Sequence, residues 1–282
     1  IQFPDSRTYA LYLKAGGTLS LDDWRRDNVN TFVQHLGAEI HAIKPWVRFG
    51  ISPFGIWRPG HPASVRGLDS YVEIFADSRK WLQNGWVDYL APQLYWPIGR
   101  PEQDFSSLLA WWVSQNDLKR NIYVGLNASL ANRTPPGGPG AAEMTDQIRL
   151  TRAQAGARGE IFFSMGVLMQ DPDSVAEHIA RDSYSVPALV PASPWLKVVP
   201  PGQPQAVARL DMQSGEMMID MDPAAGEKQP WLWVVQARTD SGWTTQIIPG
   251  AENTRLLAGR GAHSPNDVRV YAVGKAGMLS RV

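Results

Sequence analysis

The stretch Val87-Asp88-Tyr89-Leu90-Ala91-Pro92-Gln93-Leu94-Tyr95-Trp96 decides the fold class of this chain. It is short, rich in apolar and aromatic residues, and follows the helix-ending pair Asn84-Gly85, which is typical of a strand in a buried sheet. Similar runs occur once before it and twice after it, at Val47–Phe54, Asn121–Asn127 and Gly159–Ser164. We therefore expect four buried strands in the first part of the chain.

Longer stretches with helical periodicity alternate with these strands. In the first of them, Asp22–Ala42, an apolar stripe runs from Val29 to Ile40 at helical spacing. The other predicted helices are Tyr71–Gln83, Ser106–Asn116, Ala142–Ala155 and Ser174–Ser183, and a loop rich in Pro and Gly is predicted at Asn132–Gly140. Strand–helix units in series predict a parallel sheet with helices outside it.

Two α/β architectures fit this series, a doubly wound sheet and one half of a (β/α)₈ TIM-type barrel. No strand is followed by G-x-G-x-x-G or by the P-loop pattern, the phosphate-binding signatures of nucleotide-binding α/β folds. This favours the barrel, of which the four strand–helix units would make one half.

The tail of the chain has a different periodicity. Residues 186–193 contain two prolines and predict a linker between a barrel domain at 1–185 and a second domain at 194–282. Seven short strands are expected in the second domain: Gln205–Leu210, Glu216–Met221, Trp231–Arg238, Thr244–Ile248, Thr254–Leu257, Val268–Val273 and Met278–Val282. They predict an all-β sandwich, and since Cys is absent we favour a fibronectin-III-like type over an immunoglobulin type.

Composition excludes several function classes. The 282 residues carry 27 Lys and Arg against 27 Asp and Glu, so there is no excess basic charge for nucleic acid. Cys is absent, which removes disulfides, thiolate metal sites and a Cys nucleophile. No apolar run reaches the ~18 residues of a membrane-spanning helix. Twelve Trp are many for this length, and an indole offers a flat apolar face and one N–H donor.

Candidate site residues follow from the barrel rule that reacting groups lie at the carboxyl ends of the strands. The residues placed there are Trp57, Arg58, Gln93, Tyr95, Trp96 and Asn127. Together they can stack on a ring and hydrogen-bond hydroxyl groups, as a carbohydrate requires. Gln93 and Tyr95 share one strand face because they are two residues apart. Each candidate also has an alternative structural role: the two Trp in packing, and Arg58 in pairing with a nearby carboxylate.

Carboxylates are scarce at these strand ends, although glycoside hydrolysis normally requires two. Asp69 and Glu73 lie on the correct side, but acidic residues at a helix start also complement the helix dipole. The catalytic residues therefore stay unknown. The five His show no H-x-x-x-H or H-E-x-x-H spacing, and we expect neither a metal nor a cofactor.

Four sequence blocks resemble the glycosyl-hydrolase-like 10 family of bacterial exported proteins. They are LSLDDWRRDNV (Leu19–Val29), KPWVRFGISPFGIWR (Lys44–Arg58), ADSRKW (Ala76–Trp81) and DYLAPQLYW (Asp88–Trp96), and the resemblance covers about residues 5–185. It implies a (β/α)₈ barrel acting on a bacterial cell-surface glycan, with peptidoglycan strands freed of peptides as the substrate class. It also implies export, to the periplasm, the cell surface or a lipoprotein anchor.

The resemblance implies that this chain holds only the C-terminal half of the family's (β/α)₈ TIM-type barrel. Relatives have four more strand–helix units, and their fourth strand ends in a motif with paired Asp; Ile1-Gln2-Phe3 resembles the core of that strand, but Pro4-Asp5 follows. The main catalytic acid is therefore expected outside these 282 residues. The leading hypothesis is a glycosidase with an oligosaccharide or polysaccharide substrate. The alternatives are a non-catalytic glycan-binding protein with a degenerate barrel and a structural adhesion module.

Overall fold

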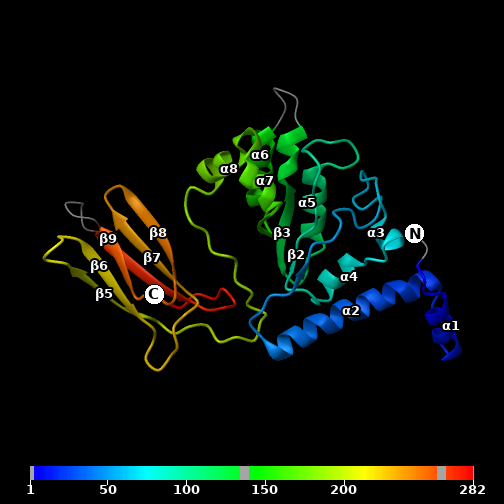
Figure 1. Ribbon diagram of the computed structural model, residues 1–282, viewed down its shortest axis with the longest axis horizontal. Coiled ribbons are helices and arrows are strands. Elements are labelled where there is room, and N and C mark those ends of the chain that lie inside the picture. The colour runs from blue at the N-terminus through cyan, green and yellow to red at the C-terminus, as the bar shows by residue number, and fades with distance from the viewer. Residues whose placement is uncertain (1–2, 134–139, 259–264, 282) are drawn as a thin grey trace. The chain divides into compact units, whose positions relative to one another are not determined.

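The computed structural model describes residues 3–133, 140–258 and 265–281. The chain forms two compact units (Figure 1). The first consists of Ile1–Ile43 and Arg48–Ser183, and the second of Lys44–Val47 and Tyr184–Val282. The predicted loop Asn132–Gly140 falls largely outside the described residues. The predicted linker at 186–193 lies within the second unit, where the Ser193 amide donates to the Ala276 carbonyl at 2.9 Å.

The first unit is built on a four-stranded parallel sheet in the order β1-β2-β3-β4. Its strands are β1 (Gly50–Ile51), β2 (Tyr89–Leu90), β3 (Asn121–Asn127) and β4 (Ala157–Phe163). The predicted parallel α/β sheet is confirmed. Each strand pairs with the next one along the chain, whereas a doubly wound sheet reverses its order at a switch point. Within the described residues the sheet has four strands and does not close on itself.

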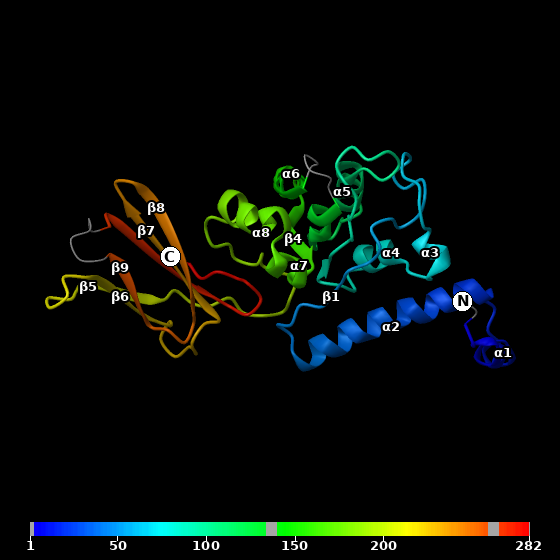
Figure 2. The same ribbon diagram turned by 45° about the horizontal axis from the view of Figure 1, so that its top comes forward.

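Helices precede, connect and follow these strands (Figures 1 and 2). They are α1 (Ser6–Lys14), α2 (Leu21–Ile43), α3 (Ser70–Glu73), α4 (Ser78–Gln83), α5 (Phe105–Ser114), the 3-10 helix η1 (Ala128–Arg133), α6 (Gly140–Ala153), α7 (Met165–Gln170), the 3-10 helix η2 (Pro172–Ser174), α8 (Val175–His178) and the π-helical turn η3 (Ile179–Ser183). Helices α5 and α6 pack against the sheet. The helix α5 contributes the fully buried Trp112, whose Nε1 donates to the Gly55 carbonyl at 2.8 Å.

The predicted helix Tyr71–Gln83 is wrong in one respect, because the structure divides it into α3 and α4. Phe75 has φ 56°, a left-handed conformation that no helix continues through. Asp77 then caps α4 by accepting a hydrogen bond from the Lys80 amide. A carboxylate two residues after the break therefore starts a new helix instead of lying inside the old one.

Strand β2 is shorter than the ten residues expected because Pro92 has no amide hydrogen for the ladder. Pairing resumes beyond the proline, where Gln93 bridges Phe54 on one side and Gly125 on the other. The close approach of these backbones requires Gly55, since a Cβ there would lie 2.2 Å from the Gln93 carbonyl oxygen. The carboxyl ends of β1, β2 and β3 are thus held in register.

One face of β4 is open to solvent. Ile161 and Phe163, two residues apart and therefore on the same face, are 42% and 58% exposed. The opposite face of the sheet is covered, since Ile122, Val124 and Leu126 of the neighbouring β3 point to that face and are fully buried. Within the described residues β3 is the only strand that pairs with β4, so apart from the single bridge between Ala155 and Ala157 the other edge of β4 is unpaired.

The Asp104 carboxylate caps α5. It accepts hydrogen bonds from the amides of Gly99 (2.6 Å) and Ser107 (2.8 Å) and from the Ser107 hydroxyl (2.7 Å). Partial burial opposes its ionisation, but these donors outweigh that effect and hold the pKa of Asp104 below its ordinary value. The charged form is therefore the one that stabilises the fold.

This cap predicts a pH-dependent stability. Because the pKa of Asp104 is lower in the folded than in the unfolded chain, its contribution is complete above the unfolded value and is lost as pH falls through the folded one. Asp104→Ala should cost about 1 kcal/mol at pH 7. Asp104→Asn keeps a capping oxygen without the charge, so the stability gap between it and the unmodified protein should close below about pH 4 in urea titrations. A gap that is constant with pH would contradict this role.

The second unit is a sandwich of two three-stranded antiparallel sheets, ordered β5-β6-β9 and β10-β7-β8. The strands are β5 (Gln205–Leu210), β6 (Met217–Asp222), β7 (Leu232–Thr239), β8 (Gly242–Pro249), β9 (Thr254–Ala258) and β10 (Asp267–Val273). Side chains of both sheets form one core, which includes Ile219 and Met221 of β6 and Trp233 and Val235 of β7. The seventh predicted strand, Met278–Val282, is reduced to one bridge, Leu279 to Val273, and Val282 lies outside the described residues.

None of the helices among the described residues is both long enough and apolar enough to cross a membrane.

Candidate functional site

The carboxyl edge of the parallel sheet brings four of the predicted site residues to one end of the first unit. Gln93, Tyr95 and Trp96 follow β2, and Asn127 ends β3. Asn127 is in register with Phe163 at the end of β4, and Gln93 is in register with Gly125 two residues before Asn127. Paired residues of adjacent strands point to the same face, so Gln93, Tyr95 and Asn127 share the face that also carries Phe163.

Gln93 is half-buried at this edge, and its amide is oriented by the neighbouring strand. Its Nε2 donates to the Ser52 carbonyl at 2.9 Å. Among the described residues no donor reaches Oε1, the acceptor end of the same amide. A fixed amide with one open acceptor can bind a sugar hydroxyl without first losing side-chain freedom.

Tyr95 carries the phenol of this edge. Its ring stacks on that of Phe163, with 5.8 Å between centroids and 27° between planes. Burial raises the pKa of the Tyr95 phenol above its ordinary value, so the hydroxyl keeps its proton at neutral pH. Tyr95 therefore presents an O–H donor two residues from the Gln93 acceptor.

Asn127 and Trp96 are also held in place by local contacts. Asn127 Oδ1 accepts from the Ser129 amide at 3.0 Å, which fixes the amide plane at the end of β3. The Trp96 indole is half-buried and stands edge-on to Phe54, with centroids 5.6 Å apart and planes at 90°. This leaves part of the indole surface at the same edge.

Two polar residues of α6 position the loop after Trp96, and sequence reasoning missed both. Gln147 Nε2 donates to the Trp96 carbonyl at 3.1 Å and to Glu143 Oε1 at 2.8 Å. Glu143 Oε1 also accepts from the Ile98 amide at 2.8 Å. The signal was present in the sequence: polar residues four apart on the buried face of a predicted helix require partners.

Trp57 and Arg58 are not placed with this group. The Trp57 indole is only 8% exposed, stacks on Trp111 with 5.9 Å between centroids, and donates from Nε1 to Asp77 at 3.1 Å. Arg58 pairs with Asp69 at 3.2 Å and lies over the Tyr71 ring. Trp57 thus packs this loop and Arg58 forms an ion pair, which are the alternative structural roles of these residues, and sugar binding by either residue stays a prediction.

Three carboxylates of the first unit, Asp69, Asp77 and Asp5, are engaged structurally. Asp69 accepts from the Val72 amide at the start of α3 as well as from Arg58, and Asp77 caps α4 while holding Trp57. Asp5 is bound by two nitrogens of Arg25, at 2.7 and 2.8 Å, which lowers the pKa of its carboxyl. Among the described residues, no three His, Asp or Glu side chains gather as metal ligands would.

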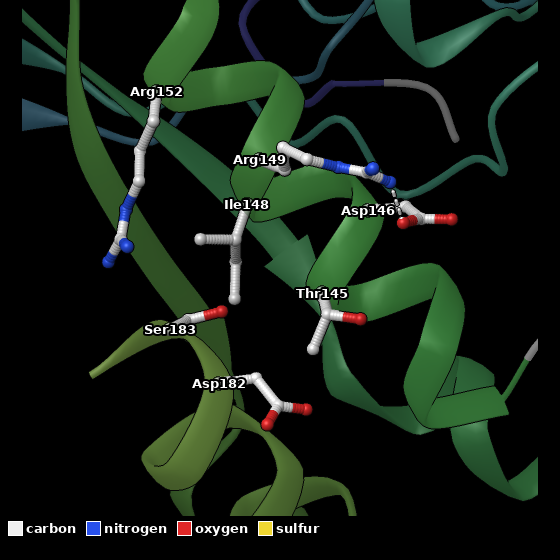
Figure 3. A pocket seen from close by; sticks show the side chains of 7 residues that line it. All are labelled: Thr145, Asp146, Ile148, Arg149, Arg152, Asp182 and Ser183. Atoms are coloured by element: carbon white, nitrogen blue, oxygen red, sulfur yellow. Dashed lines mark hydrogen bonds and ion pairs between the residues drawn. The ribbon is translucent and has the colours of Figure 1, made fainter. Parts of the chain in front are cut away.

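A separate hollow of about 350 Å³ lies between α6 and η3 (Figure 3). Its lining is Thr145, Asp146, Ile148, Arg149, Arg152, Asp182 and Ser183. Arg149 forms an ion pair with Asp146 of the same helix, and Arg181, which is not part of the lining, pairs with Asp182 at 2.7 Å, which lowers the pKa of that carboxyl. The lining offers no aromatic face, and it belongs to helical elements instead of strand ends, so we do not take it as the site.

The sequence of this chain is similar to those of known proteins. The model of the family "Glycosyl hydrolase-like 10" matches residues 1–136. The chain is 36% identical over 236 residues to the glycosyl hydrolase YngK of Bacillus subtilis (strain 168), which covers 80% of this chain and 46% of YngK. It is 37% identical over 127 residues to the glycosyl hydrolase DigH of Escherichia coli (strain K12), covering 43% of this chain and 28% of DigH.

The chain thus spans less than half the length of these curated relatives. The matched region contains β1, β2 and β3 and all of the strand-end residues described above except Phe163. Residues 1–136 of this chain therefore belong to the glycosyl hydrolase-like 10 family.

Proposed function

We propose that the first unit is the C-terminal half of a (β/α)₈ barrel and that the second is a fibronectin-III-like sandwich. The sequential parallel order of the four strands, the open face of β4 and the greater length of the relatives support the half barrel. The strand order β5-β6-β9 opposite β8-β7-β10, with Leu279 bridging to the end of β10, supports the sandwich type.

We propose that the whole protein is a glycoside hydrolase of a bacterial cell-surface glycan, with peptidoglycan glycan strands as its substrate. The carrying observation is the shared face of Gln93, Tyr95 and Asn127 at the carboxyl edge of the sheet, where barrel enzymes bind substrate. In this proposal Gln93 Oε1 accepts from one sugar hydroxyl, Tyr95 donates to another, and Trp96 offers an apolar edge. The acid and base belong to strand ends outside this chain, and the protein is exported because its substrate lies outside the cytoplasm.

The proposal predicts losses for Gln93→Ala and Tyr95→Phe in the full-length protein. Each should lower glycan affinity or turnover by about 1–3 kcal/mol, the cost of leaving a buried partner group unpaired. Tyr89→Phe is the matched control, because Tyr89 lies at the opposite end of β2 and its ring packs on Tyr123. The assays are calorimetric binding and release of reducing ends from peptide-free glycan strands. Lower melting temperatures with unchanged glycan affinity would contradict the cleft assignment.

A glycan-binding protein without hydrolytic activity is the second candidate. It is favoured by one observation: Asp69, Asp77 and Glu143 are all occupied, the first two as helix caps and side-chain partners and Glu143 as the acceptor for Ile98 and Gln147. The two candidates differ in a single measurement on the full-length protein. Release of reducing ends supports the enzyme, and tight binding of strands with no release supports the binding protein.

A further inference from the structure

A second hollow, of about 380 Å³, lies entirely within the second unit. Its walls come from four separate segments, namely Trp46, residues 198–201, residues 227–231 and residues 274–275. The volume is in the range of small-molecule sites. Its lining differs from that of the hollow beside α6, because two tryptophans take part in it.

Trp231 is the exposed aromatic surface of this hollow. Its side chain is 59% exposed, yet its backbone is fixed on both sides: its amide donates to the Val273 carbonyl at 2.9 Å, and its carbonyl accepts from Gly250 at 3.1 Å. Gly250 is required for this contact, since a Cβ there would lie 1.9 Å from the Pro230 carbonyl oxygen. The exposed apolar face of this indole is in unfavourable contact with water and adds nothing to the core. Exposed aromatic surface on a fixed backbone is typical of a binding site.

The other walls are stiff and carry polar ends. Pro200, Pro201 and Pro230 line the hollow and restrict its backbone. Lys275 Nζ lies 4.6 Å from the centre of the Trp46 ring, so its ammonium is held at the hollow by a cation–π contact. Glu227 is oriented by two hydrogen bonds from the Gly202 amide, at 2.9 and 3.1 Å.

We propose that this hollow is a second glycan-binding site, in which a sugar ring stacks on Trp231 and its hydroxyl groups bind Lys275 and Glu227. A pyranose combines an apolar ring face with a rim of hydroxyls, and the lining combines an indole face with fixed charged groups. A proline-rich peptide would require several exposed parallel aromatic rings, whereas here Lys275 lies over one of the two indoles. The inference rests on the proposed glycan substrate. When a polymeric glycan is bound at this second site of the protein, the effective concentration of glycan at the first site rises.

The test is calorimetric titration of the protein with a β-1,4-linked N-acetylglucosamine tetramer, together with co-sedimentation with peptide-free glycan strands. Trp231→Ala should weaken binding at least about tenfold, equivalent to about 1.4 kcal/mol. Because Trp231 is largely exposed, this variant should keep the melting temperature. Trp243→Ala is the matched control: its indole is 44% exposed in the same unit but lies beneath Arg238 and Arg269, outside the hollow, so its removal should leave the affinity unchanged.

Gln93→Ala, measured in parallel, separates this inference from the proposed function. Binding that depends on Gln93 but not on Trp231 overturns the second site and leaves the cleft proposal standing. Binding that depends on Trp231 but not on Gln93 supports the second site and contradicts the cleft. Failure of the unmodified protein to bind either probe, or displacement of the tetramer by a proline-rich peptide, also overturns the inference.

Discussion

Residues 1–282 expressed without further sequence are expected to self-associate. The cause is the open face of β4, where Ile161 and Phe163 are 42% and 58% exposed, together with the unpaired edge of that strand within the described residues. Met165 and Met169, just after the strand, are 68% and 76% exposed and extend the apolar surface. Patches of this kind beside an unpaired strand bind a second chain or aggregate.

Sedimentation velocity over a concentration series measures this association. The double variant Ile161→Lys/Phe163→Lys should raise the dissociation constant at least roughly tenfold, because each truncated interface anchor costs about 1 kcal/mol or more. Phe32→Lys is the control: Phe32 is 64% exposed but lies on α2, away from the sheet edge. A monomeric product that unfolds cooperatively would contradict the half-barrel proposal.

Trp112→Ala is expected to give the largest loss of stability. Trp112 of α5 is fully buried, and removing a buried Trp costs about 3–5 kcal/mol. The change also leaves the Gly55 carbonyl without the indole donor at 2.8 Å. The melting temperature of the first unit should fall by roughly 10 °C.

Differential scanning calorimetry checks this value, with the transition of the second unit as an internal reference. Trp111→Ala is the control, since the neighbouring indole is half-buried and stacks on Trp57 at 5.9 Å, so its removal should cost less. Trp112→Phe keeps most of the apolar volume and isolates the hydrogen bond to Gly55, at about 1–3 kcal/mol. Equal losses of stability in Trp112→Ala and Trp111→Ala would show that the complete burial of Trp112 does not determine its contribution to stability.

Sequence periodicity predicted the parts of the fold in which one pattern governs a whole element. Strand β3 spans Asn121–Asn127 as expected, because every residue up to Leu126 is buried and the run contains no proline. Strand β5 likewise has its expected bounds. Helix α1, Ser6–Lys14, was not predicted, and it has no buried residue from which an apolar stripe could be recognised.

Other features depend on contacts between distant residues and left no local signal. The break between α3 and α4 requires Phe75 in a left-handed conformation, which a bulky residue adopts only where packing determines it; its side chain is 9% exposed. Trp57 follows a strand in the sequence, as a sugar-binding Trp would, so its position alone does not distinguish packing from sugar binding. Only the stacking of Trp111 from the later helix α5 shows that its ring faces protein. The shared face of Gln93 and Tyr95, which follow β2, was easier to predict because it follows from parity alone.

Because Lys44–Val47 belongs to the second unit, the two units are not encoded by two consecutive stretches of the gene. The chain passes between the units three times, at 43/44, 47/48 and 183/184, so no single cut divides it into two complete parts. A fragment starting at Tyr184 would lack Trp46 and with it one wall of the hollow in its own unit. If recombination moved the sandwich from one barrel protein to another, the segment Lys44–Val47 that follows α2 would have to move with it. Otherwise the transferred sandwich would lack Trp46.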